Sequence, residues 1–387
     1  MINLTTADKA LKDIYLTAIT NQLNTSANPL FARIKRSTNN VYGNNIRKLV
    51  PYGVNGGVGA GTESGDLPSA VGNKYACFET SLKNLYGTIE ITDKAIRASE
   101  NSEGAFVNLL TSEMESLIEA SSMNFARMLY GDGTGALATV VSNTKNAVSV
   151  DTDIYLFEGM LVDIYDGSTA SVTGRTIESI GNDSSGNPVI NLSGAEIGTL
   201  KNTDKVYVQN SKGLEITGLK AIFGDSATLY GVPRASNAWV RPYTENVDGT
   251  ISLSAIRKAV DCVERDTGSR SNFIVCSLGV KRSLENYLTD NAIPYVTRIV
   301  DGFKAIMLDG IPVVGDRFCP EGTMFILNTD DFTLHQLCDW RWLEGEDGKI
   351  LRQKSGQPVY TATLVKYCEL ICNRPRGQAM LTGITES

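Results

Sequence analysis

The chain has few of the residues that build metal sites and almost none of the patterns that direct export. It contains one histidine and seven scattered cysteines, none of them in a Cys-x-x-Cys pair, whereas a structural zinc site needs four ligands at short paired spacings. No apolar run approaches the ~20 residues of a membrane span, and the start lacks the layout of a secretory signal. We therefore expect no metal, no cofactor and no membrane partner, with reduced, buried thiols and folding in the cytosol.

Catalytic motifs are equally scarce. Gly224-Asp225-Ser226 is similar to the opening block of GDS-type esterases, in which the serine is the nucleophile. Such an enzyme also needs a histidine base with an aspartate three residues before it, but the preceding aspartates lie four and five residues before His335. We therefore predict that the protein is not an enzyme and that His335 is an ordinary strand side chain. Esterase activity is kept only as a minor alternative.

Glycine is abundant, but its placement does not match phosphate-binding loops. Gly131, Gly133 and Gly135 follow a predicted helix, whereas a dinucleotide fingerprint follows a strand and opens a helix. The segment from Gly53 to Gly65 lacks the Gly-Lys-Ser/Thr ending that holds phosphate and magnesium. We interpret the first group as a helix terminator and the second as the tip of a loop.

Charge is unevenly placed along a chain whose net charge is −7. The first 48 residues are basic, with two acidic residues against seven basic ones: Lys9, Lys12, Arg33, Lys35, Arg36, Arg47 and Lys48. An amphipathic helix is predicted to begin near Thr6 and to fade before Asn28-Pro29, and its apolar positions are Leu11, Ile14, Tyr15, Ala18 and Ile19. A basic arm on an acidic body indicates a partner that is another copy of the chain or a polyanion.

Residues 41–92 have the pattern of a long β-hairpin. Six of the thirteen residues from Gly53 to Gly65 are glycine, so the tip has little side-chain surface to bury and should be mobile unless a partner holds it. A plain flexible loop is the alternative. A long helix, about 40 Å at ~1.5 Å per residue, is predicted from Ser102 to Tyr130. Its outer positions are acidic, including Glu103, Glu113, Glu115 and Glu119.

The sequence pattern changes after residue 140 and again after residue 250. Residues 140–213 contain several short strands separated by turn clusters, which predicts a small β-barrel or sandwich inserted into a larger domain. From residue 250 helices and strands alternate, with one helix predicted from Ser252 and another capped by Ser277, which indicates a compact α/β unit. The tail adds strands at Thr333–Trp342 and Tyr360–Cys372.

The order of these parts resembles that of the major capsid proteins of tailed bacteriophages, whose fold is shared by encapsulins. Short phrases are also similar in style to that family: Asn124–Gly133, Gly218–Ile222, Leu229–Val232, Gly310–Val314 and Cys319–Thr323. The resemblance covers nearly all of the chain except residues 140–213. It implies an α+β fold, the tailed-phage major capsid fold, with an N-terminal arm, an extended loop, a peripheral domain with a long spine helix, an axial α/β domain and an inserted β-barrel.

Mapped on this chain, the resemblance implies five parts. They are an arm at 1–40, an extended loop at 41–92, a peripheral domain at 93–139, 214–244 and 334–372, the inserted barrel at 140–213, and an axial domain at 245–333 and 373–387. The tip of the axial domain, near Asn291–Asp301, would surround the five- and six-fold axes.

The function implied is self-assembly into hexamers and pentamers of an icosahedral phage head that encloses double-stranded DNA. The partners implied are many copies of the chain, DNA bound without sequence preference, a separate scaffold protein, a portal and a decoration protein, and the location is the virion, assembled in the host bacterial cytoplasm. An encapsulin-like shell and a tail or surface protein that binds carbohydrate are the alternatives. Candidate subunit-interface residues are Arg33, Lys35, Arg36, Gly56, Gly57, Gly59, Gly61, Glu113, Glu115, Glu119, Pro294 and Arg298.

Among these residues we predict one specific contact: the bases Arg33, Lys35 and Arg36 of one subunit meet the acids Glu113, Glu115 or Glu119 of the next. The alternatives are an arm that faces packaged DNA or is merely solvated.

Overall fold

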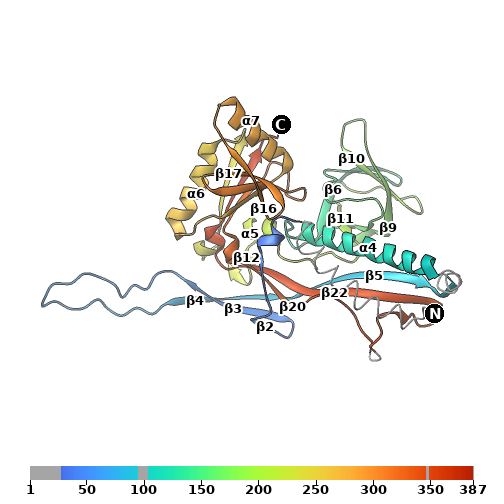
Figure 1. Cartoon of the computed structure of the whole chain (residues 1–387), viewed down its shortest axis with the longest axis horizontal. Helices are drawn as coiled ribbons and strands as arrows, with labels where there is room; N and C mark the ends of the chain where they lie inside the picture. Colours follow the sequence, from blue (N-terminus) through green and yellow to red (C-terminus); the bar gives the residue numbers. More distant parts are fainter. Residues whose placement is uncertain (1–27, 95–102, 346–347, 387) are drawn as a thin grey trace.

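The computed structural model describes residues 28–94, 103–345 and 348–386. The amphipathic helix predicted near Thr6 lies outside these residues. Figure 1 shows an α/β body, a barrel beside it, a long sheet with one helix along it, and a two-stranded ribbon that projects far from the rest. The molecule is therefore elongated, and its parts differ greatly in how much of their surface the chain itself covers.

The α/β body contains a seven-stranded sheet in the order β14-β23-β19-β15-β18-β17-β16. Two helices with serine N-caps belong to this body: the Ser252 side chain accepts a hydrogen bond from Ala255 N, and the Ser277 side chain accepts one from Val280 N. The cap at Ser277 and the helix start at Ser252 were predicted. The elements are β14 Tyr243–Gly249, α6 Leu253–Thr267, β15 Phe273–Cys276, α7 Leu278–Asp290, β16 Val296–Val300, β17 Phe303–Leu308, β18 Ile311–Gly315, β19 Met324–Leu327 and β23 Ala379–Ile384.

A second, five-stranded sheet carries the long helix. Its strands are β1 Lys35–Ser37, β20 Phe332–Trp342, β22 Val359–Cys372, β21 Arg352–Gln353 and β5 Lys83–Thr92, and the helix is α4 Glu103–Met128. Gly87 on β5 explains how closely α4 approaches, because a Cβ there would lie 3.0 Å from Leu117 Cδ1 and from Ser121 Oγ. The helix predicted from Ser102 to Tyr130 is confirmed from Glu103 to Met128, and Ser102 lies outside the described residues.

The ribbon consists of β3 Asn45–Tyr52 and β4 Lys74–Ser81, with the short β2 Val41–Tyr42 beside β3. The structure divides the single hairpin predicted over residues 41–92. β3 pairs with β4 only as far as Ser81, whereas β5 pairs along its whole length with β22, from Thr92↔Val359 to Lys83↔Cys368. The apolar residues Leu85, Ile89 and Ile91 alternate with polar ones in the sequence and are the buried face of β5, but this alternation does not specify the partner strand.

Six strands close into a barrel in the order β10-β7-β6-β11-β8-β9. Their bounds are β6 Ala136–Thr144, β7 Ala147–Val150, β8 Leu161–Asp166, β9 Thr169–Asn182, β10 Pro188–Leu192 and β11 Lys205–Val208. The barrel has its own core, which includes Val148, Val150, Val162, Ile164, Ile190 and Val206. The first strand begins four residues before the expected boundary at residue 140.

Short elements connect these parts: η2 Phe31–Arg33, α5 Leu219–Phe223, β12 Thr228–Leu229, β13 Val232–Pro233, η3 Ala238–Val240, η4 Thr329–Asp331 and η5 Pro375–Gly377. The largest core cluster joins residues of η2, the ribbon's base, α4, α5 and the five-stranded sheet. The α/β body has a separate cluster on the face covered by α6 and α7.

Candidate interaction surfaces

The tip of the ribbon, residues 53–73, has very little internal support. Its cross-links are few, such as Asn55 Nδ2 donating to Asn73 Oδ1 at 3.0 Å and Gly65 N donating to Thr62 O at 3.2 Å. Three apolar side chains are almost fully exposed: Val54 at 92%, Leu67 at 88% and Val58 at 87%. Exposed apolar groups on a segment that the chain itself does not cover mark an interaction surface. The predicted interface residues Gly56, Gly57, Gly59 and Gly61 all lie in this tip.

The base of the ribbon, in contrast, is anchored by stacked aromatic rings. Trp239 stacks on Tyr52 with ring centroids 4.9 Å apart, and on Phe78 at 5.6 Å. Phe78 also contacts Tyr230 at 5.1 Å, and Glu79 N donates to Tyr230 O at 3.0 Å. The Tyr230 hydroxyl in turn donates to Leu370 O on β22. The direction in which the ribbon leaves the body is therefore set by packing, although its tip is unsupported.

The described part of the arm, residues 28–40, lies on its own chain. Phe31 packs edge-on against Phe125 of α4 at 5.1 Å, and β1 pairs in parallel with β20, Lys35 opposite Thr333. The three predicted interface bases all have acidic partners within the chain: Arg33–Asp301 at 2.6 Å, Lys35–Asp330 at 2.7 Å and Arg36–Asp339 at 3.2 Å. Contact of these bases with another subunit stays a prediction, and such a contact would have to compete with these pairs.

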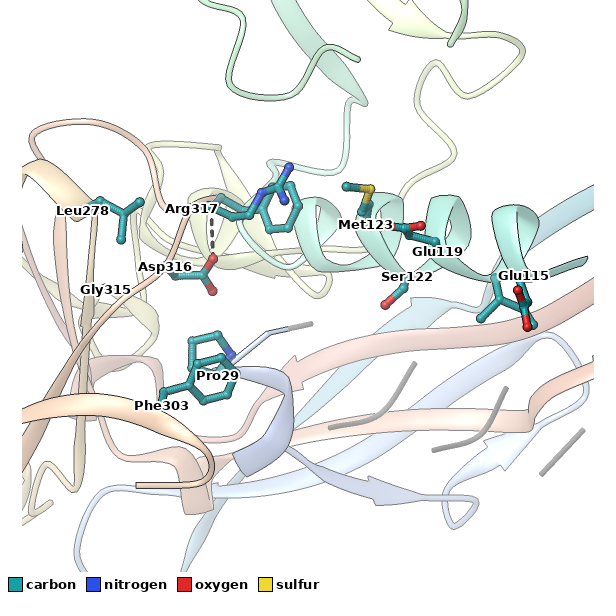
Figure 2. A pocket seen from close by; sticks show the side chains of 12 residues that line it. Pro29, Glu115, Glu119, Ser122, Met123, Leu278, Phe303, Gly315, Asp316 and Arg317 are labelled. Carbon is teal, nitrogen blue, oxygen red and sulfur yellow. Dashed lines mark hydrogen bonds between the residues drawn. The ribbon is translucent and has the colours of Figure 1, made fainter. Parts of the chain in front are cut away.

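The acidic residues of α4 that the sequence suggested, Glu113, Glu115 and Glu119, are exposed. Two of them line a groove of about 770 Å³ between α4 and the α/β body, whereas Glu113 does not. Figure 2 shows this groove, with α4 along one wall and Pro29 and Phe303 across from it. The groove is thus formed by segments that lie far apart in the sequence.

The axial tip predicted near Asn291–Asp301 is an exposed sheet edge. β16 pairs with β17 and is the last strand of the seven-stranded sheet, so within the described residues its outer edge has no partner strand. Ile299 is 80% exposed and Val296 57%, and the candidate residues Pro294 and Arg298 are exposed as well. Apolar side chains on an unpaired edge favour association with another chain. The β16–β17 pair was missed in the sequence because its strands carry no buried alternation.

Buried charged groups in the middle of the molecule have structural partners. Arg127 on α4 forms a bidentate pair with Glu215, at 2.6 and 2.9 Å, and both side chains are almost fully buried. Burial raises the pKa of the Glu369 carboxyl on β22 to about 7. Its Oε1 accepts hydrogen bonds from Thr217 N and Leu370 N, while Oε2 has no partner within the described residues. Sequence patterns did not point to Glu369, because a single acid inside a strand has no spacing signal.

The two residues of the esterase alternative, Ser226 and His335, each have other polar neighbours in the structure. The Ser226 hydroxyl donates to Thr228 O. His335 is buried on β20, where its Nδ1 lies 2.9 Å from Asn39 O and its Nε2 3.4 Å from Lys48 Nζ, and burial lowers its pKa. Both ring nitrogens therefore have neighbours other than the serine. Within the described residues no group of three or more His, Cys, Asp or Glu side chains is placed to hold a metal ion, and no helix there is long and apolar enough to cross a membrane.

Comparison with known proteins gives no match to any family model and no match to a curated sequence. Solved structures are similar in fold. The capsid asymmetric unit of cyanophage A-1(L) matches with a TM-score of 0.54 at 12% identity, over 95% of this chain and 93% of that chain. The procapsid of satellite phage P4 matches with a TM-score of 0.49 at 9% identity, over 96% and 99% of the two chains. The holo-SrpI encapsulin complex from Synechococcus elongatus PCC 7942 matches with a TM-score of 0.47 at 10% identity, over 95% of each chain.

The similarity to the cyanophage capsid extends over nearly the whole of both chains. The class that this defines is a mixed α+β protein with the capsid fold of tailed phages. Within that class the resemblance expected from the order of parts in the sequence is confirmed at the level of the fold.

Proposed function

We propose that this chain is the major capsid protein of a tailed bacteriophage. In this proposal it self-assembles, without catalysis, into the hexamers and pentamers of an icosahedral head that encloses double-stranded DNA. It is then a virion protein, assembled in the host bacterial cytoplasm together with a separate scaffold protein, a portal and a decoration protein. The fold supports this proposal, and one observation carries it: a ribbon with a rigid base presents exposed apolar side chains far from its own body.

Each part has a role in the proposed shell. The ribbon, within 41–92, lies across an adjacent subunit, and the arm at 1–40 extends the contact. The peripheral domain, 93–139 with 214–244 and 334–372, forms the edge of each capsomer. The axial domain, 245–333 with 373–387, brings the exposed edge of β16 to the five- and six-fold axes. The barrel, 140–213, projects from the outer surface.

The physical basis of assembly in this proposal is multivalency. The tip of the ribbon buries too little apolar surface within its own chain to be rigid, so it becomes ordered on neighbouring copies. Each such contact is weak, but a subunit that makes several of them at once is held with a much greater combined affinity. A closed shell then follows from many copies of a few modest contacts.

Electron microscopy of the expressed chain, with and without its scaffold protein, tests the proposal. Closed particles that contain nucleic acid are the expected result. Particles that contain protein cargo in place of nucleic acid would indicate an encapsulin-like shell. Small oligomers without closed particles would contradict the proposal and favour a tail or surface protein that uses the barrel to bind carbohydrate.

Replacing residues 54–72 by Asn-Gly, which forms a tight hairpin turn, tests the role of the ribbon. The free energy of unfolding of the subunit should change by less than about 1 kcal/mol, because the tip is unsupported in the chain alone. Particle formation should be lost. Particles of normal size and yield from this variant would contradict the proposal that the ribbon is needed for assembly.

A further inference from the structure

The tip of the ribbon contains the pair Asn55-Gly56, which is the only Asn-Gly step in the sequence. Such a pair is reactive, because the backbone nitrogen after an asparagine can attack the side-chain amide carbon and close a five-membered succinimide ring. Glycine in the second position favours this closure, since it has no Cβ to obstruct the ring and adopts the widest range of backbone angles. Folded structure opposes the reaction wherever it holds that nitrogen in a hydrogen bond.

The Gly56 nitrogen is not held in this way. Among the residues that the structure describes, Gly56 N has no hydrogen-bond acceptor, and both Asn55 and Gly56 are exposed. They lie beyond the end of β3, where the ribbon is far from the body of the molecule (Figure 1). A segment with so few internal contacts can rotate to bring the nitrogen to the amide carbon, and water can reach the nitrogen to remove its proton.

Other exposed asparagines that precede a small residue lack this freedom. Ser211 N, after Asn210, and Ala292 N, after Asn291, each donate a hydrogen bond of 3.0 Å to the backbone carbonyl three residues earlier. Attack by either nitrogen would first require that hydrogen bond to break and the backbone to move. Sequence and structure therefore both select the tip of the ribbon.

The Asn55 side chain is already turned toward the backbone that follows it. Its Oδ1 accepts a hydrogen bond from Gly57 N at 2.9 Å. Negative charge develops on this oxygen when a nitrogen adds to the amide carbon, and a donor that already points at the oxygen lowers the barrier. A glycine at position 57 permits this approach, because a Cβ there would lie 3.1 Å from Asn55 Oδ1.

We propose that Asn55-Gly56 is a site of spontaneous deamidation in the unassembled chain. Gly56 N loses its proton to water and bonds to Asn55 Cγ, and the bond from Cγ to Nδ2 then breaks, so that the amide nitrogen takes up a proton and leaves as ammonia. Water opens the ring: attack at Cγ gives aspartate, and attack at the main-chain carbonyl carbon of residue 55 gives isoaspartate. In the net reaction water is consumed and ammonia is released, and nothing is oxidised or reduced.

Either product changes the chemistry of the tip. It removes the Nδ2 donor that bonds to Asn73 Oδ1, and it adds a carboxylate to a segment, residues 53–73, that has no basic residue. An unpaired charge is costly to remove from water, so the modified tip should pack less well on an apolar surface. This consequence, unlike the deamidation, rests on the capsid function proposed above: subunits that age before assembly should form fewer particles than fresh ones.

Peptide mapping by mass spectrometry, after incubation of the full-length, unassembled chain, tests the deamidation. Residue 55 should convert to a mixture of aspartate and isoaspartate at least as fast as in a synthetic peptide of residues 49–61, and faster at higher pH. Asn210 and Asn291 should stay intact over the same period. Retention of Asn55 while the peptide converts overturns the proposal. Conversion to aspartate alone also overturns it, because that product requires direct hydrolysis without a ring.

The glycine that follows provides a variant with a matched control. Gly56→Ala should slow the conversion about tenfold or more, which needs only ~1.4 kcal/mol of additional barrier, because a Cβ obstructs ring closure. The folded chain accommodates this Cβ, which would lie 3.5 Å from Val71. Gly61→Ala, whose Cβ would lie 3.8 Å from Asp66 O, should leave the rate unchanged. Equal rates in wild type and Gly56→Ala would contradict attack by this nitrogen.

Particle formation by Asn55→Asp separates the deamidation from its consequence for assembly. This variant carries the carboxylate from the start and should form fewer particles than fresh wild type, whereas incubated Gly56→Ala should assemble as well as its fresh counterpart. Normal particle yield from Asn55→Asp would reject the consequence for assembly, while the peptide maps still decide the deamidation. A fresh wild-type chain that forms no particles with its scaffold protein would instead count against the proposed function.

Discussion

The barrel and the ribbon are both built from antiparallel strands, but they differ in their strand edges. The barrel closes and has no free edge, whereas the ribbon is open. In the barrel every strand has two neighbours, and the enclosed side chains form a separate core. In the ribbon β3 and β4 face each other over a narrow width, and beyond Gly53 no ladder continues. Closure makes the barrel self-sufficient, whereas the open ribbon is complete only at its base.

The comparison teaches where stability and assembly reside in this molecule. The parts that bury their own surface determine the free energy of unfolding of the subunit. The parts that cannot do so, namely the ribbon's tip and the edge of β16, contribute little to that free energy and are free to contact other chains. Substitutions in the self-buried parts should therefore lower the free energy of unfolding of the subunit. Substitutions in the ribbon's tip or the edge of β16 should instead affect assembly.

The largest expected effect is on the barrel core. Val148 is fully buried there, and Val148→Asp places an unpaired carboxylate among apolar side chains, at a cost of ~5 kcal/mol. Val141→Asp is the control, because Val141 is 44% exposed on β6, and its effect should stay within ~1 kcal/mol. Hydrogen exchange should show loss of protection over residues 136–208 in Val148→Asp alone. Simultaneous loss of protection in β15 and β18 would show that the barrel is not self-sufficient.

The base of the ribbon should respond next most strongly. Trp239→Ala removes the ring that stacks on both Tyr52 and Phe78, and should lower the free energy of unfolding by ~2–3 kcal/mol, because Trp239 is only partly buried. Exchange in β3 and β4 should accelerate, whereas the barrel should be unchanged. Trp239→Phe keeps a ring in the stack and should recover more than half of the loss. Equal exchange in β3 and β4 of wild type and Trp239→Ala would show that the ribbon is held by other contacts.

The pH dependence of stability should depend on Glu369. Because burial raises its pKa to about 7, the folded state binds its proton more tightly than the unfolded chain, whose carboxyl titrates near 4.5. The stabilising contribution is fully present below pH ~4.5 and is lost as pH rises through about 7, by at most ~3 kcal/mol. Glu369→Gln should remove this decline between pH 5 and 8 in chemical denaturation. If the free energy of unfolding of the wild type and of Glu369→Gln changes with pH in parallel, Glu369 does not titrate in this range.

The smallest effect on stability, though not on assembly, is expected for the arm. Reversing Arg33, Lys35 and Arg36 to Glu breaks three exposed or half-exposed pairs, each worth at most ~1 kcal/mol, so the subunit should remain folded. Lys145→Glu, which breaks the exposed pair with Glu196 on the barrel, is the control and should assemble normally. If the three bases contact a neighbouring subunit, the triple variant should give no particles. Normal particles from the triple variant would reject that contact.

Much of the element content could be predicted because local physics determines it. The N-cap at Ser277, the helix start at Ser252 and the helix α4 depend on a few neighbouring residues, and the structure has them where the sequence predicts them. Which strands pair with each other was harder to predict from the sequence. That β5 joins β22 rather than β4 is decided by residues almost 280 positions away, and no local pattern encodes it. The internal partners of Arg33, Lys35 and Arg36 were missed for the same reason.

The closure of the barrel has one more consequence. Its first and last strands, β6 and β11, are direct neighbours, with Thr139 opposite Lys205, and just outside them Gly213 N donates to Thr134 O at 2.7 Å. The chain thus enters and leaves this module through one narrow neck. If the barrel residues between Thr134 and Gly213 are removed, the two ends lie close enough for a single short turn to join them. The barrel can therefore be exchanged as a unit. Foreign domains whose termini lie equally close could be carried there, and the body would then lose only the contacts of Tyr155 and Phe157, which pack against its largest core cluster.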